Sequence, residues 1–161
     1  MGDRLVNLRV GLRWLATISM KPILCSRVYE TAPVGCPKES PSFLNAVCEM
    51  VTDQDVLELL RQLRDFERQQ GRSMVYEKNA SRPLDMDMLY AGDLVVQTEE
   101  LTLPHPRMLE RRFVLKPLSD IRPGLVLPGQ ACAVSKLLAS LKNGGRIRVY
   151  QDGCYEDKNQ L

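Results

Sequence analysis

The sequence is poor in the residues that most often mark a metal centre, a membrane span or a nucleic-acid surface. It has one histidine, and its five cysteines are scattered with no close pair. This excludes the usual zinc-binding spacings and is typical of reduced thiols in the cytosol. Aromatic residues make up only 6% of the chain and the net charge is +2, which argues against a nucleic-acid surface. No apolar run approaches the length of a membrane span, and the first residues carry no hydrophobic segment typical of secretion.

What remains is the composition of an ordinary globular domain. The chain has 161 residues, of which 44% are hydrophobic and 26% charged, enough for a single domain with a hydrophobic core. We expect this domain over residues 1–150 and a polar tail over residues 151–161. Helix and strand patterns alternate along the chain, with neighbouring strands antiparallel, which predicts an α+β sandwich of helices packed on a sheet.

Hydrophobic spacing predicts four helices and several strands. Alternation over residues 43–52 places Phe43, Asn45 and Val47 on one face of a strand. The apolar run around Asp85 and Asp87 predicts another strand, with a turn at 91–93 before a further strand at 93–97. The remaining expected elements are helices at 7–18, 52–72, 108–118 and 134–143, a strand at 22–30 and an edge strand at 146–150.

The helix at 52–72 has the clearest pattern. Thr52 or Asp53 can cap its start, acidic residues fill its first turn, and Gly71 can end it. Its buried stripe is predicted to consist of Val56, Leu59, Leu60, Leu63 and Phe66.

The stretch "YEKNASRPLDMDMLY", residues 76–90, places two aspartates one residue apart in an apolar run. On a strand, Asp85 and Asp87 point the same way, and paired carboxylates suit Mg²⁺ bound beside phosphates. The alternative is that both aspartates pair with arginines on a solvent-facing sheet. Arg72, Lys78 and Arg82 lie just upstream, and a mobile basic loop before two acids suggests closure over a polyphosphate.

Several single residues have both a structural and a functional interpretation. Asn45 is either a satisfied core amide or a donor and acceptor for a ligand edge. His105, between two prolines, is more often a plain loop residue than a ligand contact. Glu67, in the last turn of its helix, is either an exposed charge or part of a site, and Phe43 and Phe113 are core residues by default.

At this point the sequence resembles a known family. The motifs "SRVYETAPVG", "PSFLNAV", "FERQQGR", "KNASRPLDMDML" and "LTLPHPRMLERRFVLKPL" occur in order, and over residues 2–128 they are similar to 6-hydroxymethyl-7,8-dihydropterin pyrophosphokinases. The resemblance implies a ferredoxin-like α+β fold with a mainly antiparallel sheet. It also implies transfer of pyrophosphate from ATP to the hydroxymethyl group of the pterin in folate biosynthesis, with AMP as the other product.

The resemblance also implies site residues and partners. Two Mg²⁺ ions would be held by Asp85 and Asp87, with ATP and the pterin as substrates. We expect a cytoplasmic monomer without nucleic-acid or membrane partners. The implied catalytic residues are Arg72, Arg82, Asp85 and Asp87; the ATP-binding residues are Glu67, Lys78, Thr102, His105 and Arg111, with Arg112 as a substitute if the register differs; the pterin-binding residues are Thr31, Ala32, Val34, Phe43, Asn45 and Phe113.

Two departures from the family pattern stand out. Asn79–Ala80–Ser81 replaces an aromatic residue followed by Gly-Pro in the loop. The family's first strand, ending in Gly-Ser-Asn, is missing before Met1, so we expect the true start to lie upstream, with a degenerate copy as the alternative. The rival interpretations are a non-catalytic ATP- or pterin-binding relic of this fold, an unrelated nucleotidyl transferase, and a nucleic-acid-binding ferredoxin-like module, which the low aromatic content disfavours.

Overall fold

The computed structural model describes residues 3–32, 42–71, 84–142 and 145–153. The predicted site residues Val34, Arg72, Lys78 and Arg82 lie outside the described residues. The elements, in chain order, are α1 (Arg4–Ile18), β1 (Leu24–Cys25), β2 (Val28–Thr31), β3 (Phe43–Asn45), β4 (Cys48–Glu49), α2 (Val56–Gln69), β5 (Val96–Gln97), β6 (Thr102–Leu103), a short 3₁₀ helix (Met108–Glu110), α3 (Arg112–Ile121), α4 (Val134–Ser140) and β7 (Ile147–Gln151).

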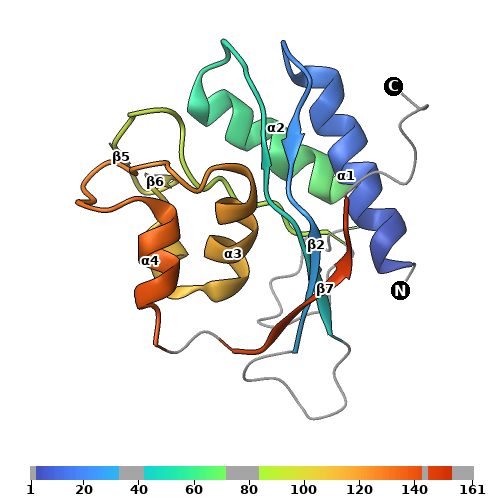
Figure 1. Ribbon diagram of the computed structural model, residues 1–161. Helices are drawn as coiled ribbons and strands as arrows, with labels where there is room; N and C mark the ends of the chain where they lie inside the picture. Colours follow the sequence, from blue (N-terminus) through green and yellow to red (C-terminus); the bar gives the residue numbers. More distant parts are fainter. Residues whose placement is uncertain (1–2, 33–41, 72–83, 143–144, 154–161) are drawn as a thin grey trace.

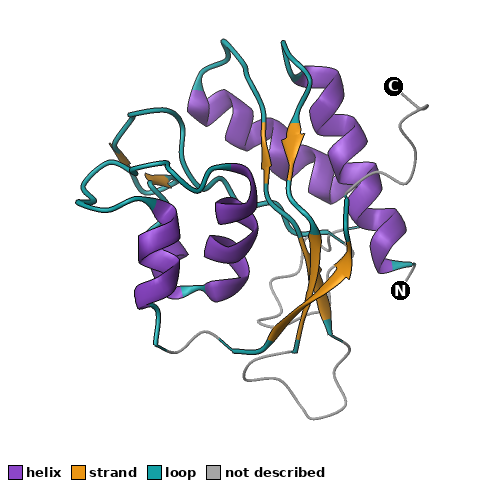
Figure 2. Cartoon of the chain, in the orientation of Figure 1, coloured by secondary structure: helices purple, strands orange, loops and turns teal. Residues whose placement is uncertain are grey.

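The strands are antiparallel, and β1 to β4 and β7 lie between two pairs of helices, whereas β5 and β6 lie to one side (Figure 1). The order β3-β2-β7 makes the largest sheet, while β1 pairs with β4 and β5 with β6. Helices α1 and α2 pack on one side of the layer formed by β1 to β4 and β7, and α3 and α4 on the other, with short strands between long loops (Figure 2). This arrangement confirms the predicted α+β class and is consistent with a ferredoxin-like sandwich. The predicted edge strand is β7.

Side-chain alternation explains why the β3–β4 run lies between two helical layers. Leu44, Ala46 and Cys48 pack against the cluster formed by Leu12 of α1 and Val28. Val47 points the other way, into the core made by α3 and α4. The single strand expected over 43–52 is two short strands, and Phe43, predicted to share an apolar face, is 50% exposed.

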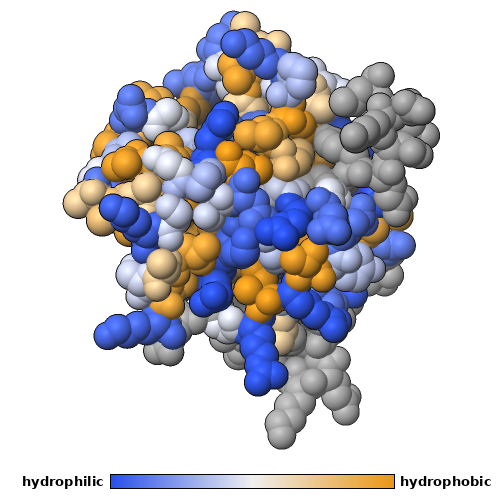
Figure 3. All heavy atoms as spheres, in the orientation of Figure 1, coloured by the Kyte–Doolittle hydropathy of each residue, from blue (hydrophilic) through white to orange (hydrophobic). Residues whose placement is uncertain are grey.

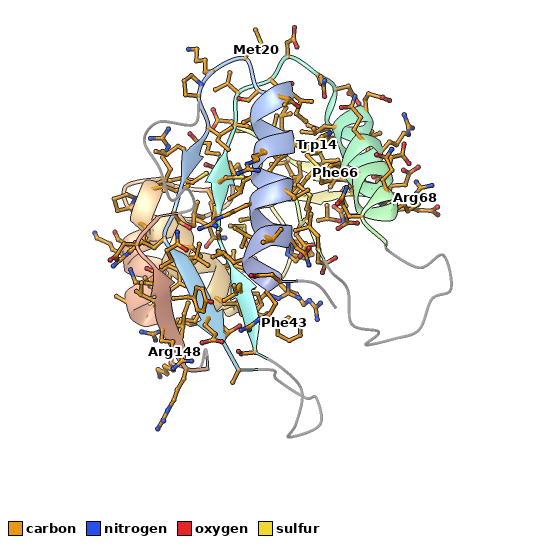
Figure 4. The ribbon with its side chains drawn as sticks, turned by 90° about the vertical axis from the view of Figure 1, so that its right-hand side faces the viewer. Trp14, Met20, Phe43, Phe66, Arg68 and Arg148 are labelled. Atoms are coloured by element: carbon orange, nitrogen blue, oxygen red, sulfur yellow. The ribbon has the colours of Figure 1, made fainter. Side chains whose placement is uncertain are left out.

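Helices α1 and α2 are joined by an aromatic pair. Trp14 and Phe66 stack with their ring centroids 4.4 Å apart, and both rings lie between the two helices (Figure 4). The α2 stripe is buried at Leu59, Leu60 and Leu63 as predicted. The predicted cap of α2 is wrong: Asp55, not Thr52 or Asp53, accepts hydrogen bonds from the N–H groups of Leu57 and Glu58.

The second helical layer supplies the most completely buried core. Met108, Leu115, Leu118 and Val134 are fully buried against one another. The helix predicted at 108–118 is a short 3₁₀ turn followed by α3, which extends to Ile121, and α4 ends at Ser140 rather than near residue 143. Within the described part of the chain, no helix has the length and apolarity needed to cross a membrane.

A polar cluster around Asp120 connects α3 to β2, the central strand of the largest sheet. Asp120 is 12% exposed and accepts hydrogen bonds from the Arg27 guanidinium at 3.0 and 3.2 Å, the Tyr29 hydroxyl at 2.6 Å and Lys116 Nζ at 2.6 Å. Burial raises the pKa of Asp120, but these donors outweigh it and lower the pKa from 3.8 to about 2. In the view of Figure 3, hydrophilic side chains gather over the middle of the molecule. The cluster therefore favours an ionised carboxylate in the folded state.

We expect the fold to lose stability in acid because of this cluster. A carboxyl group whose pKa is lower in the folded state stabilises the protein above its unfolded pKa and loses that contribution as the pH falls. Glu30 behaves alike: hydrogen bonds from Ser42 and Arg148 lower its pKa from 4.5 to about 2. The melting temperature should therefore fall between about pH 5 and pH 2.

The variant Asp120→Asn provides the test by thermal denaturation at a series of pH values. Its melting temperature should be lower than that of the wild type at pH 7, and the two curves should converge in acid. Asp53→Asn, at an exposed loop position, serves as the matched control and should follow the wild type throughout. If the melting temperatures of the wild type and Asp120→Asn stayed parallel over the whole pH range, ionised Asp120 would not be the source of the acid sensitivity.

Candidate functional site

Residues 84–90, which carry both aspartates, form no strand and pair with none among the described residues. The strand prediction for this run is therefore wrong. Exposure nevertheless alternates: Asp85 and Asp87 are exposed, whereas Leu84, Met86 and Met88 are partly buried. The two carboxylates thus lie on the solvent side, as the period of two predicts, and the cost of burying two charges does not arise.

Packing from both α1 and α2 holds the apolar side of this run. Leu84 lies over Gly11 of α1, where an added Cβ would be 3.0 Å from Leu84 Cδ2. Met86 and Met88 pack against Leu15 of α1 and against Leu59 and Leu63 of α2. The absence of a side chain at Gly11 allows this close approach, so residues from two helices fix the face opposite the aspartates.

Glu67 fixes the backbone between the two aspartates. It is 2% exposed at the end of α2, and its Oε1 accepts a hydrogen bond from the Met86 N–H at 2.6 Å. The interpretation of Glu67 as an exposed helix charge is therefore wrong. A poorly solvated N–H needs an acceptor, so Glu67 holds Met86, and with it the spacing of Asp85 and Asp87, against α2.

A second carboxylate anchors the far end of the run. The Tyr90 hydroxyl donates to Glu49 of β4, and the Arg122 guanidinium after α3 donates to the same carboxylate. The Arg122 hydrogen bond is the main cause that lowers the pKa of Glu49; burial and the bond to Glu49 raise the pKa of Tyr90. Tyr90 therefore remains a protonated donor. The sequence analysis did not predict the group of Tyr90, Glu49 and Arg122. Its one signal in the sequence was Glu49, an acidic residue inside the alternating run 43–52.

His105, Arg111 and Asp87 come together beside this run. The Arg111 guanidinium lies 3.8 Å from Asp87 Oδ2 and 5.6 Å from the centroid of the Phe113 ring. The His105 backbone N–H donates to the Leu89 carbonyl at 2.8 Å, which connects the loop after β6 to the aspartate run. The structure thus brings His105 and Arg111, two predicted ATP-binding residues, close to Asp87, a predicted metal ligand. Thr102, on β6, is exposed.

The His105 imidazole is arranged to be a neutral donor at pH 7. Burial lowers its pKa from 6.5, Asp87 raises it, and Arg111 and Arg107 lower it further. The Arg107 backbone N–H donates to Nδ1 at 3.2 Å. Because Nδ1 accepts, the proton of the neutral ring lies on Nε2. That N–H can donate to an anionic ligand near Asp87.

We expect two variants to move the His105 pKa in opposite directions. Removing the negative charge in Asp87→Asn should lower the pKa, whereas removing the positive charge in Arg111→Gln should raise it. The chain has one histidine, so its ring signals in an NMR pH titration need no assignment. Asp93→Asn, in the nearby exposed turn, is the control and should leave the pKa unchanged. Shifts of the same sign in both site variants would contradict this geometry.

Three of the predicted pterin residues lie together on the β2–β3 hairpin. Thr31 pairs directly with Phe43, and Asn45 Nδ2 donates to Thr31 Oγ1 at 2.9 Å. Phe43 lies at the lower end of the sheet, away from the aromatic pair of α1 and α2 (Figure 4). The partly buried Asn45 amide therefore has a partner in the described structure.

Two cavities adjoin the predicted site residues. One of about 170 Å³ lies beside His105 and is lined by Pro104, His105, Pro106, Met108, Leu109, Leu127, Pro128 and Gln130. The other, of about 570 Å³, lies at the end of the three-stranded sheet and is lined by Glu30, Ala32, Ser42, Arg112, Gly145, Arg146, Ile147 and Arg148. Ala32 and Arg112 line the larger cavity. They are next in sequence to Thr31 and Phe113, two of the predicted pterin-binding residues.

The described residues fit a divalent cation only as a partial site. They contain no group of three or more histidine, cysteine or acidic side chains arranged around one point. Asp85 and Asp87 supply two exposed carboxylates on one side of the run. Mg²⁺ beside a nucleotide takes one or two carboxylates and completes its coordination with phosphate oxygens and water, so this donor set suits Mg²⁺ that arrives with a polyphosphate.

An α+β domain that places two exposed carboxylates beside a neutral histidine and an arginine has the features of an enzyme that handles phosphate esters with a divalent cation. The chain belongs to the family of 7,8-dihydro-6-hydroxymethylpterin-pyrophosphokinases, whose model matches residues 1–123. The family predicted from the sequence motifs is thereby confirmed.

Named relatives agree with this family. The chain is 39% identical over 123 residues to 2-amino-4-hydroxy-6-hydroxymethyldihydropteridine pyrophosphokinase of Haemophilus influenzae, which covers 76% of each chain. It is 37% identical over 122 residues to the folic acid synthesis protein FOL1 of Dictyostelium discoideum, covering 76% of this chain and 18% of that protein. It is 39% identical over 121 residues to a mitochondrial folate synthesis bifunctional protein of Arabidopsis thaliana, covering 75% and 22%. The chain spans about a fifth of the length of the longer relatives.

Proposed function

We propose that this chain transfers the terminal diphosphate of ATP to the hydroxymethyl oxygen of 6-hydroxymethyl-7,8-dihydropterin and releases AMP, as a step of folate synthesis. The observation that carries the proposal is the placement of Asp85 and Asp87 on one exposed side of a run anchored by Glu67 and Tyr90. Family membership supplies the reaction, and the site supplies the charges it needs. Cytoplasmic location and the monomeric state stay predictions from the sequence.

In this reaction the protein mainly aligns the reactants and offsets charge. Mg²⁺, in the two-ion arrangement implied by the family resemblance, would lie on Asp85 and Asp87 and neutralise the ATP phosphates. His105 Nε2–H and the Arg111 guanidinium would bind phosphate or ribose oxygens near Asp87. The implied roles of Arg72, Lys78 and Arg82 as cations over the phosphates belong to the same proposal, as does that of Thr102 in ATP binding.

The pterin would lie near the β2–β3 hairpin. Thr31 and Asn45 carry the hydroxyl and amide that suit a pterin edge, while Phe43 and Phe113 offer rings to pack against its flat face. Ala32 and Val34 continue the same chain segment. The buried position of Glu67 favours a positioning role over direct contact with ATP.

The test is AMP release from ATP and Mg²⁺, measured with and without the pterin acceptor on this chain. AMP that appears only with the acceptor, in amounts equal to the pterin diphosphate formed, is the expected result. Release that ignores the acceptor would indicate a different transferase. No release from a chain shown to be folded by circular dichroism would overturn the proposal and favour the non-catalytic ATP- or pterin-binding alternative.

A further inference from the structure

Cys25 and Cys48 face each other across the two-stranded sheet of β1 and β4. They are direct register partners in this antiparallel pair, and both are partly buried thiols that belong to no disulfide. Their side chains also share one face, because both pack against the cluster of Leu12 and Val28. The pair was not predictable from cysteine spacing, since 22 residues separate the two cysteines.

The hydrogen bonds next to the pair define its geometry. Ser26, which follows Cys25, donates its backbone N–H to the Val47 carbonyl at 2.9 Å, and the Val47 N–H donates to Ser26 Oγ at 3.0 Å. Hydrogen-bonded and non-hydrogen-bonded pairs alternate along antiparallel strands. Cys25 and Cys48 are therefore a non-hydrogen-bonded pair, whose Cα atoms in such ladders are about 4.5 Å apart, within the range that a disulfide spans.

We propose that Cys25 and Cys48 are a site of reversible thiol oxidation, at which a low-molecular-weight disulfide converts the pair into a cross-strand disulfide. The two backbones already stand at disulfide spacing, so the bond requires little movement of β1 or β4. This property is separate from the phosphate chemistry and does not depend on it.

The two sulfurs have different roles in the exchange. The hydrogen bond to Cys25, and then burial, raise the pKa of the Cys48 thiol. Cys48 therefore keeps its proton and donates to Cys25, which leaves the Cys25 sulfur to make the first attack. Cys25 is only partly buried, so a small disulfide can reach it. Cys48 then serves as the resolving thiol.

The exchange balances without any further reactant. The Cys25 thiolate attacks one sulfur of oxidised glutathione, which forms a mixed disulfide and releases one glutathione thiolate. The Cys48 sulfur then attacks Cys25 Sγ, which forms the cross-strand bond and releases the second glutathione thiolate. The protons of the two protein thiols pass to the two glutathione thiolates, so the protein is oxidised by two electrons and glutathione disulfide is reduced to two thiols.

The bond would enclose residues 26–47, the stretch that carries β2 and β3. Closing this loop reduces the conformational freedom of the unfolded chain, so the oxidised protein should melt at a temperature about 5 to 10 °C higher than the reduced one. Dithiothreitol should reverse the change completely.

The experiment uses the full chain and a variant in which Cys36, Cys132 and Cys154 are all replaced by serine. Each protein is equilibrated in mixtures of oxidised and reduced glutathione, quenched in acid, alkylated and mapped by mass spectrometry. The expected product in both proteins is a peptide pair joined through Cys25 and Cys48, with loss of two hydrogens and the higher melting temperature. In Cys48→Ser, oxidation should stop at a mixed disulfide of Cys25 with glutathione.

Exposed Cys132 provides the internal control in the full chain, because it should form only a mixed disulfide. If Cys25 and Cys48 stay reduced in mixtures that fully modify Cys132, or if Cys25 stays a mixed disulfide while Cys48 is present, the proposal is overturned. If Cys48→Ser does not fold, the triple serine variant, which retains both thiols, decides the matter by the same readouts.

Discussion

Replacing Asp87 by asparagine should reduce acceptor-dependent AMP release by about 10²- to 10³-fold, and Asp85→Asn should have an effect of the same order. Asparagine keeps the shape of the side chain but removes the negative charge that holds a divalent cation. Both positions are exposed, and the Asp87–Arg111 pair is long and partly solvated, so neither change should disturb folding.

The measurement is a rate of AMP formation at several Mg²⁺ concentrations, with melting temperature as the check on folding. A lost cation ligand should shift the Mg²⁺ dependence to higher concentration as well as lower the rate. Asp93→Asn is the matched control because it removes another exposed charge, from the turn that follows the same run. If Asp85→Asn and Asp87→Asn both retain more than about a tenth of the activity, the aspartates do not hold the catalytic cation.

The helices were predictable from the sequence to the extent that local rules decide them. The stripe Leu59, Leu60 and Leu63 repeats at helical spacing, and the structure buries it. The start of α2 was not predictable in the same way, because Thr52, Asp53 and Asp55 are all suitable caps within four positions. Only the turn before the helix decides that Asp55 accepts the first N–H groups.

The run around the aspartates shows where local rules fail. Its period of two correctly predicted that Asp85 and Asp87 share a side, because an extended backbone alternates its side chains whether or not it pairs. Pairing itself requires a neighbour, which no pattern within residues 84–90 can supply. In the described structure Glu67 and Glu49 provide anchors in place of a sheet ladder. Both lie far from the run in sequence, so their role could not be predicted from spacing.

Glu67→Ala should lower the free energy of unfolding by about 1–3 kcal/mol and reduce the turnover rate more than it changes the apparent affinity for ATP. The change leaves the Met86 N–H without its acceptor in a site that water reaches poorly, since Glu67 is 2% exposed. Loss of this hydrogen bond frees the backbone between Asp85 and Asp87. Misplaced carboxylates should then slow the aligned transfer, even though both charges are still present.

Glu67→Gln separates the hydrogen bond from the charge, because its amide oxygen can still accept from Met86 N–H. We expect it to recover most of the stability and turnover lost in Glu67→Ala. Glu58→Ala, at a 54% exposed position on the same helix, is the control and should change stability by less than about 0.5 kcal/mol. Chemical denaturation and steady-state kinetics on the three variants provide both readouts. A glutamine variant as impaired as the alanine variant would show that the charge of Glu67 acts on the site directly, rather than through the position of Met86.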